Sequence, residues 1–155
     1  RYPRGIGEGA DWRNAESTPL PIGKGERLAD GEDVAVLALG PVANRALEAA
    51  ERLRKETGKS PAVFNVRFLK PFDQEILKEA AGYRCILTLE DGAIKGGLFS
   101  EVSEYVASTG ARIPVIGVGI PDRFITQAPV GRQREQCGLT TEIIYSKIVS
   151  LIKNN

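Results

Sequence analysis

The sequence holds at residues 34–39 the run Val34-Ala35-Val36-Leu37-Ala38-Leu39, which Gly40-Pro41 ends. Alternating apolar and polar residues would indicate a strand with one face in water. A continuous apolar run of this length is typical of a strand that is buried on both faces. Such strands lie in parallel sheets that helices cover on both sides, so the run predicts an α/β domain.

The residues after this strand have helical spacing. Between residues 42 and 57 the apolar positions recur every three or four residues, with charged residues between them, and Gly58 follows as a left-handed helix end. The apolar positions are Val42, Ala46, Ala49, Ala50 and Leu53. The pattern predicts a helix that packs one face on the sheet.

The same alternation of strand and helix continues to the end of the chain. We expect further strands at 62–66, 85–89 and 113–118, and a short edge strand at 25–29. We expect further helices at 73–81 with Asp73 as N-cap, from Gly96-Gly97 to Ser108, around 131–137, and from Thr140 or Thr141 onward. The fold class is therefore a three-layer α/β/α domain with a mostly parallel sheet and right-handed crossovers.

Residues 1–24 differ in composition from the rest of the chain. They are rich in Gly and Pro and have no helical or alternating apolar period. We expect 1–24 to be a linker or the tail of a preceding domain, and 25–155 to be the α/β domain. The sequence contains no Met, so we also expect it to be part of a longer polypeptide.

The composition argues against several function classes. The net charge of +1, from 21 basic and 20 acidic side chains, gives no reason to expect a nucleic acid or an acidic membrane as partner. No apolar run approaches the ~20 residues that span a bilayer, and no signal peptide is recognisable. The chain has no His, which argues against a His-based triad or metal site, and Cys85 and Cys137 are expected to be reduced thiols.

Any site of the domain is expected at the carboxyl ends of the strands, where open parallel sheets bind ligands and partners. The four loops there are Gly40-Pro41, Arg67–Phe72, Glu90–Gly97 and Gly119–Gln127. Arg67 and Lys70 are candidates for contact with a phosphate or a facing domain. The alternative is that Arg67 covers the end of the sheet and Pro71 sets the entry to the next helix.

The loop Glu90–Gly97 carries two candidate functions. Glu90 and Asp91 could act as a general base or as magnesium ligands, and Gly96-Gly97 could let an anion approach the free N–H groups of a helix N-terminus. However, neighbouring strand residues point to opposite faces, so the two carboxylates need not share a site. A Gly pair is equally required where backbone packs closely against another domain.

Two further segments are candidates for contacts. Phe124-Ile125 is too apolar for a solvated loop, so it either folds back on the core or docks against a partner. Arg1-Tyr2-Pro3-Arg4-Gly5 carries two cations and is a candidate anion site, since arginine pairs well with phosphate. Arg132 and Arg134 are expected on a solvated helix face.

Together these motifs resemble a known family. The chain contains, in order, RYPRG (1–5), PIGKG (21–25), VAVLALG (34–40), FNVRFLKPFD (64–73), LTLEDGAIKGG (87–97), VGIPDRFI (118–125) and CGL (137–139). This order resembles the C-terminal third of the 1-deoxy-D-xylulose-5-phosphate synthase family over nearly the whole chain. The RFLKPFD, EDGAIKGG and GIPDRFI segments also resemble transketolase C-terminal domains more widely, including those of 2-oxoacid dehydrogenase β subunits.

The resemblance implies a five-stranded mixed sheet whose first strand is antiparallel to the rest. It implies a parent transferase that joins pyruvate to glyceraldehyde 3-phosphate with loss of carbon dioxide, for isoprenoid, thiamine and pyridoxal biosynthesis. Thiamine diphosphate and Mg²⁺ would be bound by two preceding domains, with no cofactor in this chain. The domain would support the fold and a homodimer in a bacterial cytoplasm, would not be catalytic alone, and would bind neither nucleic acid nor membrane.

Within this resemblance, Arg4 matches the family arginine that binds the phosphate of glyceraldehyde 3-phosphate. The chain departs from the family pattern at Thr126-Gln127 in place of His-Gly, at Thr140 in place of Asp, and at GGLFS (96–100) in place of GGFGS. These changes concern loop contacts rather than the fold. A transketolase, a dehydrogenase β subunit and a non-enzymatic assembly module remain alternatives.

Overall fold

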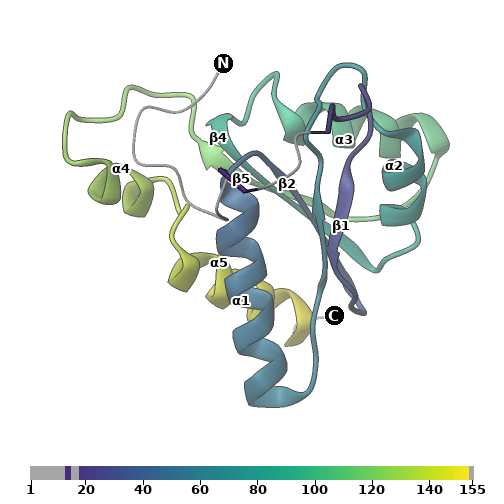
Figure 1. Cartoon of the computed structure of the whole chain (residues 1–155), viewed down its shortest axis with the longest axis horizontal. Coiled ribbons are helices and arrows are strands. Elements are labelled where there is room, and N and C mark those ends of the chain that lie inside the picture. The colour runs from purple at the N-terminus through teal and green to yellow at the C-terminus, as the bar shows by residue number, and fades with distance from the viewer. Residues whose placement is uncertain (1–12, 15–17, 154–155) are drawn as a thin grey trace.

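The structure, a computed structural model, describes residues 13–14 and 18–153. Five strands form one sheet in the order β1-β3-β2-β4-β5 (Figure 1). Their bounds are β1 Glu26–Ala29, β2 Val34–Leu39, β3 Ala62–Asn65, β4 Cys85–Ala93 and β5 Val115–Ile120. β1 is antiparallel to β3, and the remaining neighbours are parallel. The predicted mixed, mostly parallel sheet is confirmed.

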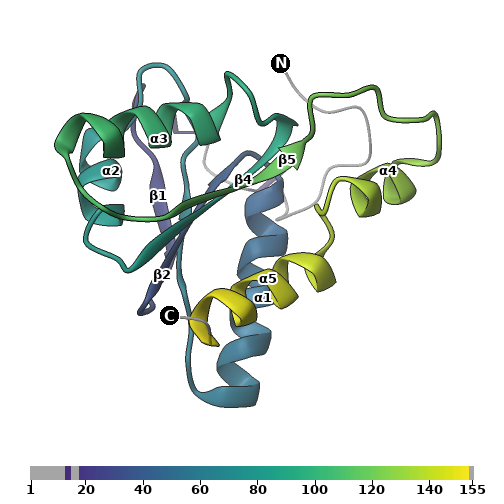
Figure 2. The same cartoon turned by 180° about the vertical axis from the view of Figure 1, so that it is seen from behind.

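Helices cover both faces of this sheet (Figures 1 and 2). α1 (Val42–Thr57) and α5 (Thr141–Lys153) pack on one face. α2 (Gln74–Ala80) and α3 (Leu98–Thr109) pack on the other. The short α4 (Val130–Gln136) follows the long loop that leaves β5. The three-layer arrangement is the one that the alternating pattern predicts.

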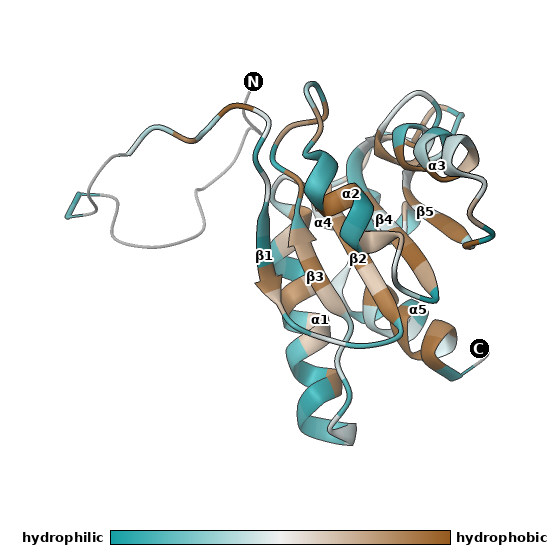
Figure 3. Ribbon diagram, turned by 90° about the vertical axis from the view of Figure 1, so that its right-hand side faces the viewer, coloured by the Kyte–Doolittle hydropathy of each residue, from teal (hydrophilic) through white to brown (hydrophobic). Residues whose placement is uncertain are grey.

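The central strand β2 is buried from both sides. Val34, Val36 and Ala38 belong to the apolar cluster under α1 and α5. Ala35 and Leu37 belong to the cluster under α2 and α3. In Figure 3 the strands carry brown, hydrophobic segments, whereas α1 is mostly teal. Of the helices in the described ranges, none is long and apolar enough to cross a membrane.

The predicted helix ends agree with local chemistry. α1 ends before Gly58, whose φ of 75° is the left-handed conformation that Gly adopts without strain. The Asp73 side chain accepts the Glu75 N–H at the start of α2. Thr140 accepts the Ile143 N–H at 3.4 Å, so Thr140 rather than Thr141 caps α5.

Two strand predictions need correction. β4 continues past Leu89 to Ala93 because its last residue pairs with Ile120. β5 lies two residues later than the predicted 113–118, between Pro114 and Pro121. Proline has no N–H to donate to a ladder, so the two prolines bound the strand.

Candidate functional site

Glu90 is the most enclosed charged residue at the carboxyl end of the sheet. Its side chain is 4% exposed, and its two oxygens accept the backbone N–H groups of Leu98 at 2.9 Å and Phe99 at 3.1 Å. These N–H groups lie in the first turn of α3, where a helix has no internal acceptors for them. A carboxylate there also interacts favourably with the helix dipole. Glu90 therefore ties the end of β4 to the start of α3.

Glycines make room for this carboxylate. A β-carbon at Gly97 would lie 2.0 Å from Glu90 Oε2 and 2.4 Å from the Ala93 carbonyl oxygen. A β-carbon at Gly119 would lie 2.9 Å from Glu90 Cγ. Both approaches are closer than a side chain allows. The glycines of this region thus serve close packing within the domain.

The hypothesis of a shared carboxylate site at Glu90 and Asp91 is not supported by the geometry. Asp91 is exposed, and its carboxylate lies 4.0 Å from Arg134 Nε, whereas Glu90 turns toward α3. Adjacent strand residues point to opposite faces, which separates the two side chains. Within the described ranges no three His, Cys, Asp or Glu side chains lie together as a metal site would require. The two carboxylates therefore do not come together as a pair of magnesium ligands, and both oxygens of Glu90 accept backbone N–H groups.

The anion site expected at Gly96-Gly97 is likewise occupied by the protein itself. Glu90 takes the N–H groups of Leu98 and Phe99, and the Gly96 N–H donates to Ser100 Oγ at 2.8 Å. The α3 N-terminus binds an internal carboxylate in place of an external anion.

Arg67 and Lys70 follow β3 in different environments. Arg67 has a φ of 59° and forms an ion pair with Glu26 of β1, and its N–H donates to Asn65 Oδ1 at 3.3 Å. Lys70 is exposed and precedes Pro71 through a cis peptide bond. The Arg67 guanidinium therefore braces two strands, while Lys70 points to the surface.

The segment Pro21–Gly25 docks on the start of α2, a contact that the sequence pattern did not predict. Asp73 is 5% exposed and accepts the Gly25 N–H at 3.1 Å, and Lys24 Nζ lies 3.5 Å from Asp73 and 2.5 Å from Glu75. A β-carbon at Gly25 would lie 2.4 Å from Ile76 Cδ1. The PIGKG and KPFD motifs thus form the two sides of one contact. Their joint occurrence in the sequence was the one feature that could have predicted it.

This contact sets the ionisation of Asp73. Burial alone would raise the pKa of the carboxyl group. The N–H groups of Gly25 and Glu75, together with the Lys24 ammonium, outweigh burial and hold the pKa below its usual value. Asp73 is therefore a charged helix cap that also anchors the preceding segment.

Phe124, in the loop after β5, is fully exposed. Nearby, Lys95 and Asp122 form an ion pair of 2.7 Å that joins the loops after β4 and β5. Ile125 lines a cavity of about 170 Å³ together with Val130 and Leu139. The sequence left two outcomes for this pair, folding back on the core or docking against a partner. Ile125 turns toward the domain, whereas Phe124 points away from it.

Comparison with known families identifies the family to which this fold belongs. Residues 23–144 match the family model "Transketolase, C-terminal domain". This chain belongs to the transketolase C-terminal domain family. The fold and the motifs at its strand ends are those that the resemblance implies.

Several curated relatives of this transketolase C-terminal domain are 1-deoxy-D-xylulose-5-phosphate synthases. The 1-deoxy-D-xylulose-5-phosphate synthase of Parabacteroides distasonis is 43% identical over 149 residues, which is 96% of this chain and 23% of that protein. The synthase of Chlorobaculum tepidum is 42% identical over 99% of this chain and 24% of that protein. The chain thus spans about a quarter of the length of these relatives.

A solved structure shows the same fold. The protein "Split gene transketolase, inactive beta4 tetramer" superposes with a TM-score of 0.77 and 34% identity, over 88% of this chain and 44% of that one. Arg4, the candidate phosphate ligand, lies outside the described residues.

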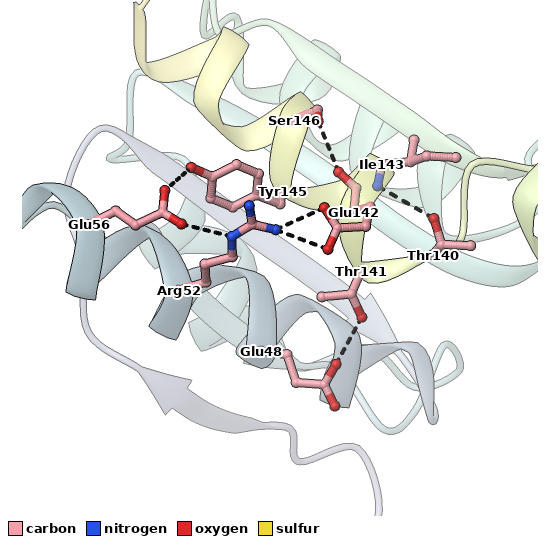
Figure 4. A network of polar contacts seen from close by, with 9 residues as sticks. All are labelled: Glu48, Arg52, Glu56, Thr140, Thr141, Glu142, Ile143, Tyr145 and Ser146. Atoms are coloured by element: carbon pink, nitrogen blue, oxygen red, sulfur yellow. Dashed lines mark hydrogen bonds and ion pairs between the residues drawn. The ribbon is translucent and has the colours of Figure 1, made fainter.

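A second polar network joins α1 to α5 in this transketolase C-terminal domain (Figure 4). Arg52 donates to Glu56 at 2.8 Å and to both oxygens of Glu142 at 2.8 and 2.9 Å, and its guanidinium lies 4.2 Å above the Tyr145 ring. The Tyr145 hydroxyl donates to Glu56, which with Arg52 lowers the pKa of Glu56. The network lies on the surface of the helical layer and links α1 to α5.

Proposed function

We propose that the chain is the C-terminal domain of a thiamine-diphosphate-dependent synthase that condenses pyruvate with glyceraldehyde 3-phosphate to 1-deoxy-D-xylulose 5-phosphate, releasing carbon dioxide. The observation that carries the proposal is the similarity to the Parabacteroides distasonis synthase, at 43% identity over 96% of this chain. The motifs RYPRG and PIGKG, which favour this enzyme within the wider superfamily, are both present.

In this proposal the domain supports the architecture and the homodimer of the parent enzyme and is inactive alone. The polar groups at the carboxyl end of the sheet are engaged internally. Glu90 holds α3, Arg67 holds β1 and Asp73 holds residues 24–25. Groups that are buried and fully hydrogen-bonded serve stability more readily than acid–base chemistry.

We place thiamine diphosphate and Mg²⁺ on the remainder of the parent polypeptide. Thiamine diphosphate supplies the carbanion chemistry that this reaction requires. Glu90 and Asp91, the best magnesium candidates in the sequence, point apart. This domain would then contribute Arg4, whose guanidinium fork suits the phosphate of the aldehyde substrate.

The exposed residues at the same end of the domain are proposed to contact the preceding domains. Phe124 is fully exposed and Lys70 lies on the surface of the loop before α2. A large aromatic side chain in water is a common feature of an interface. Lys24 and Gly25, which lie at the proposed boundary between the linker and the domain, are tied to the start of α2 through Asp73. A bacterial cytoplasm is the proposed location.

A transketolase is the second candidate for the parent enzyme. The split-gene transketolase shares 34% identity with the chain and superposes over 88% of it. Its C-terminal domain would have the same contacts, so the two candidates differ in the substrates of the parent enzyme.

The test is pyruvate decarboxylation by the full-length parent with thiamine diphosphate and Mg²⁺, with and without glyceraldehyde 3-phosphate. Carbon dioxide release that depends on the aldehyde phosphate, with deoxyxylulose phosphate as product, is the expected result. Transfer between ketose and aldose phosphates would favour the transketolase, and absence of every such activity would contradict both candidates. The isolated chain serves as the negative control.

A further inference from the structure

An apolar run lies on the surface just before the first strand. It reads Pro19-Leu20-Pro21-Ile22, and all four residues are exposed, Leu20 at 54% and Ile22 at 79%. In Figure 3 the segment that leads into β1 carries brown, hydrophobic positions. Single exposed apolar residues are common on protein surfaces, whereas an uninterrupted exposed run of this length indicates a surface with a binding function.

The end of this run is held in a turn. The Lys24 N–H donates to the Pro21 carbonyl oxygen at 3.2 Å, which closes a turn over residues 21–24. The third residue of the turn, Gly23, has a φ of 74°, as a type II turn requires. Ile22 is the second residue, and the turn presents its side chain to solvent.

The turn is also fastened to the domain. A β-carbon at Gly23 would lie 2.9 Å from Pro71 Cγ, so the turn lies directly against the loop before α2. The residues that follow are held by Asp73, which accepts the Gly25 N–H at 3.1 Å and lies 3.5 Å from Lys24 Nζ. The domain thus fixes the backbone of the turn and leaves the apolar side chains uncovered. A surface that is preorganised in this way loses little conformational entropy when it binds.

The turn lies at the carboxyl end of the parallel strands. It leads into β1, whose first residue, Glu26, pairs with Asn65 at the end of β3. Phe124, in the loop that leaves the carboxyl end of β5, is also exposed. β1 and β5 are the two edge strands, separated by four strand spacings, or roughly 20 Å. An interface of ordinary size buries about 800 Å² on each partner, which is enough to cover both features.

The partner that fits this surface is the preceding part of the parent polypeptide. The chain covers 23% of the Parabacteroides distasonis synthase, and the match to the family model begins at Gly23, directly after the apolar run. A preceding domain would therefore be connected to this one through the run itself. A covalently joined surface acts at an effective concentration on the order of millimolar, so a small apolar contact suffices. Residues 18–22 carry no charge, which favours an apolar surface on the partner.

We propose that residues 19–22 form an interdomain docking turn, in which Ile22 packs into an apolar site on the preceding part of the parent polypeptide. The inference rests on the proposed function, which assigns preceding domains to the same polypeptide, and it adds a contact to the one proposed for Phe124. It does not depend on the substrates of the parent enzyme, because apolar side chains carry the contact.

Thiol labelling at position 22 tests the proposal. Ile22→Cys is introduced into the 155-residue chain and into the full-length parent, and peptide-resolved mass spectrometry follows its reaction with N-ethylmaleimide. In the isolated chain the thiol is exposed and should react rapidly. In the full-length protein it should react at least about tenfold more slowly, because it becomes accessible only when the contact opens. Ser108→Cys near the exposed end of α3 is the matched control and should react equally in both proteins.

Two results of the labelling experiment would overturn the proposal. The first is an equal rate at position 22 in the isolated chain and in the full-length protein. The second is labelling of the isolated chain that slows as its concentration rises, because a second copy of the chain would then cover the run.

A charge at the same position provides a second test. Ile22→Asp should leave the urea midpoint of the isolated chain unchanged, because the side chain is exposed there, and should lower the first unfolding midpoint of the full-length protein, where a carboxylate would be buried. Ser108→Asp adds the same charge away from the run and should change neither midpoint. A full-length I22D protein that unfolds like wild type would overturn the proposal. Neither test measures turnover, so failure of this contact and failure of the proposed reaction are distinguishable.

Discussion

The α-carbon of Gly97 faces the Glu90 carboxylate so closely that a β-carbon there would lie 2.0 Å from Oε2. The same oxygen accepts the Leu98 N–H at 2.9 Å. The glutamate at the end of β4 and the glycine before α3 therefore depend on each other. The EDGAIKGG motif is a structural junction, and substitutions within it should first affect stability.

Replacing Glu90 should destabilise the domain without changing the surface. Glu90→Ala leaves the Leu98 and Phe99 N–H groups without their acceptor, and each buried unsatisfied group costs about 1–3 kcal/mol, so we expect a total loss of about 3 kcal/mol. Glu90→Gln keeps one acceptor oxygen and should lose about half as much. Urea denaturation of the isolated chain measures both.

Glu104 on the exposed side of α3 provides the control. Glu104→Gln should leave the urea concentration at the unfolding midpoint unchanged. If Glu90 were instead a general base, E90Q would abolish activity of the full-length enzyme while its unfolding curve stayed at the wild-type position. That combination would contradict the structural role.

Gly97→Ala should be more harmful than an ordinary glycine substitution. The added carbon would overlap both Glu90 Oε2 and the Ala93 carbonyl oxygen, and overpacking of this kind costs about 1–3 kcal/mol. Gly131→Ala in α4, where no atom lies within 4 Å of the added carbon, should be neutral or stabilising by up to about 1 kcal/mol. The double variant Glu90→Ala/Gly97→Ala lacks the Glu90 carboxylate with which the new β-carbon would clash. Its loss of stability should therefore be smaller than the sum of the losses of the two single variants. Additive losses would show that the two residues are not coupled.

The layers of the fold were predictable because each follows from a local pattern. The run Val34–Leu39 indicated a strand buried on both faces, and the spacing in 42–57 indicated the helix beside it. The ends of β4 and β5 were predicted less well. They depend on the pairing of Ala93 with Ile120, and a pairing between distant residues leaves no periodic signal.

The roles of the strand-end residues could not be predicted because they depend on side-chain direction. The sequence places Glu90 and Asp91 side by side, but it does not show that the N-terminus of α3 binds only the first. Similarly, the contact between Asp73 and the N–H of Gly25 joins residues 48 positions apart. The joint occurrence of the PIGKG and KPFD motifs was the only feature of the sequence that indicated this contact.

Asp73 should give the domain a part of its acid sensitivity. Its pKa is lower in the folded chain than in the unfolded chain, so its contribution to stability is present above the unfolded pKa of about 4 and is lost as the pH falls through the folded pKa. Asp73→Asn keeps a good N-cap residue but removes the charge that the Lys24 ammonium and the Gly25 and Glu75 N–H groups stabilise. It should therefore cost about 1 kcal/mol at pH 7, and the difference from wild type should shrink as the pH falls below about 4.

Denaturation curves collected from pH 7 to pH 2.5 measure this difference. Glu75→Gln is the matched control, because Glu75 also pairs with Lys24 but is 84% exposed. It should change stability little at any pH. If the difference in unfolding free energy between D73N and wild type were the same from pH 7 to pH 2.5, the charge of Asp73 would not contribute to stability.

Arg52 should stabilise the α1–α5 contact through shape as well as charge. Lysine keeps the charge but cannot donate to Glu56 and Glu142 in a planar fork or stack on Tyr145. Arg52→Lys should therefore lower the unfolding midpoint slightly, and the loss should persist at high salt, where ion pairs are screened and stacking is not. Arg54→Lys on the exposed side of the same helix is the control. A loss that vanishes in high salt would assign the effect to charge alone.

Arg4 provides the prediction that connects this domain to catalysis. If its guanidinium binds the phosphate of the aldehyde substrate, Arg4→Ala in the full-length enzyme should raise the KM for glyceraldehyde 3-phosphate and leave the KM for pyruvate nearly unchanged. One lost charged hydrogen-bonding partner corresponds to about 1.5–3 kcal/mol, or roughly a tenfold to hundredfold change. Arg4→Lys should recover part of the loss, because it keeps the charge without the fork. Steady-state kinetics with each substrate varied in turn separates the two effects. Equal weakening toward both substrates would show that Arg4 acts on the structure of the enzyme, and an unchanged KM for the aldehyde phosphate would remove Arg4 from the substrate site.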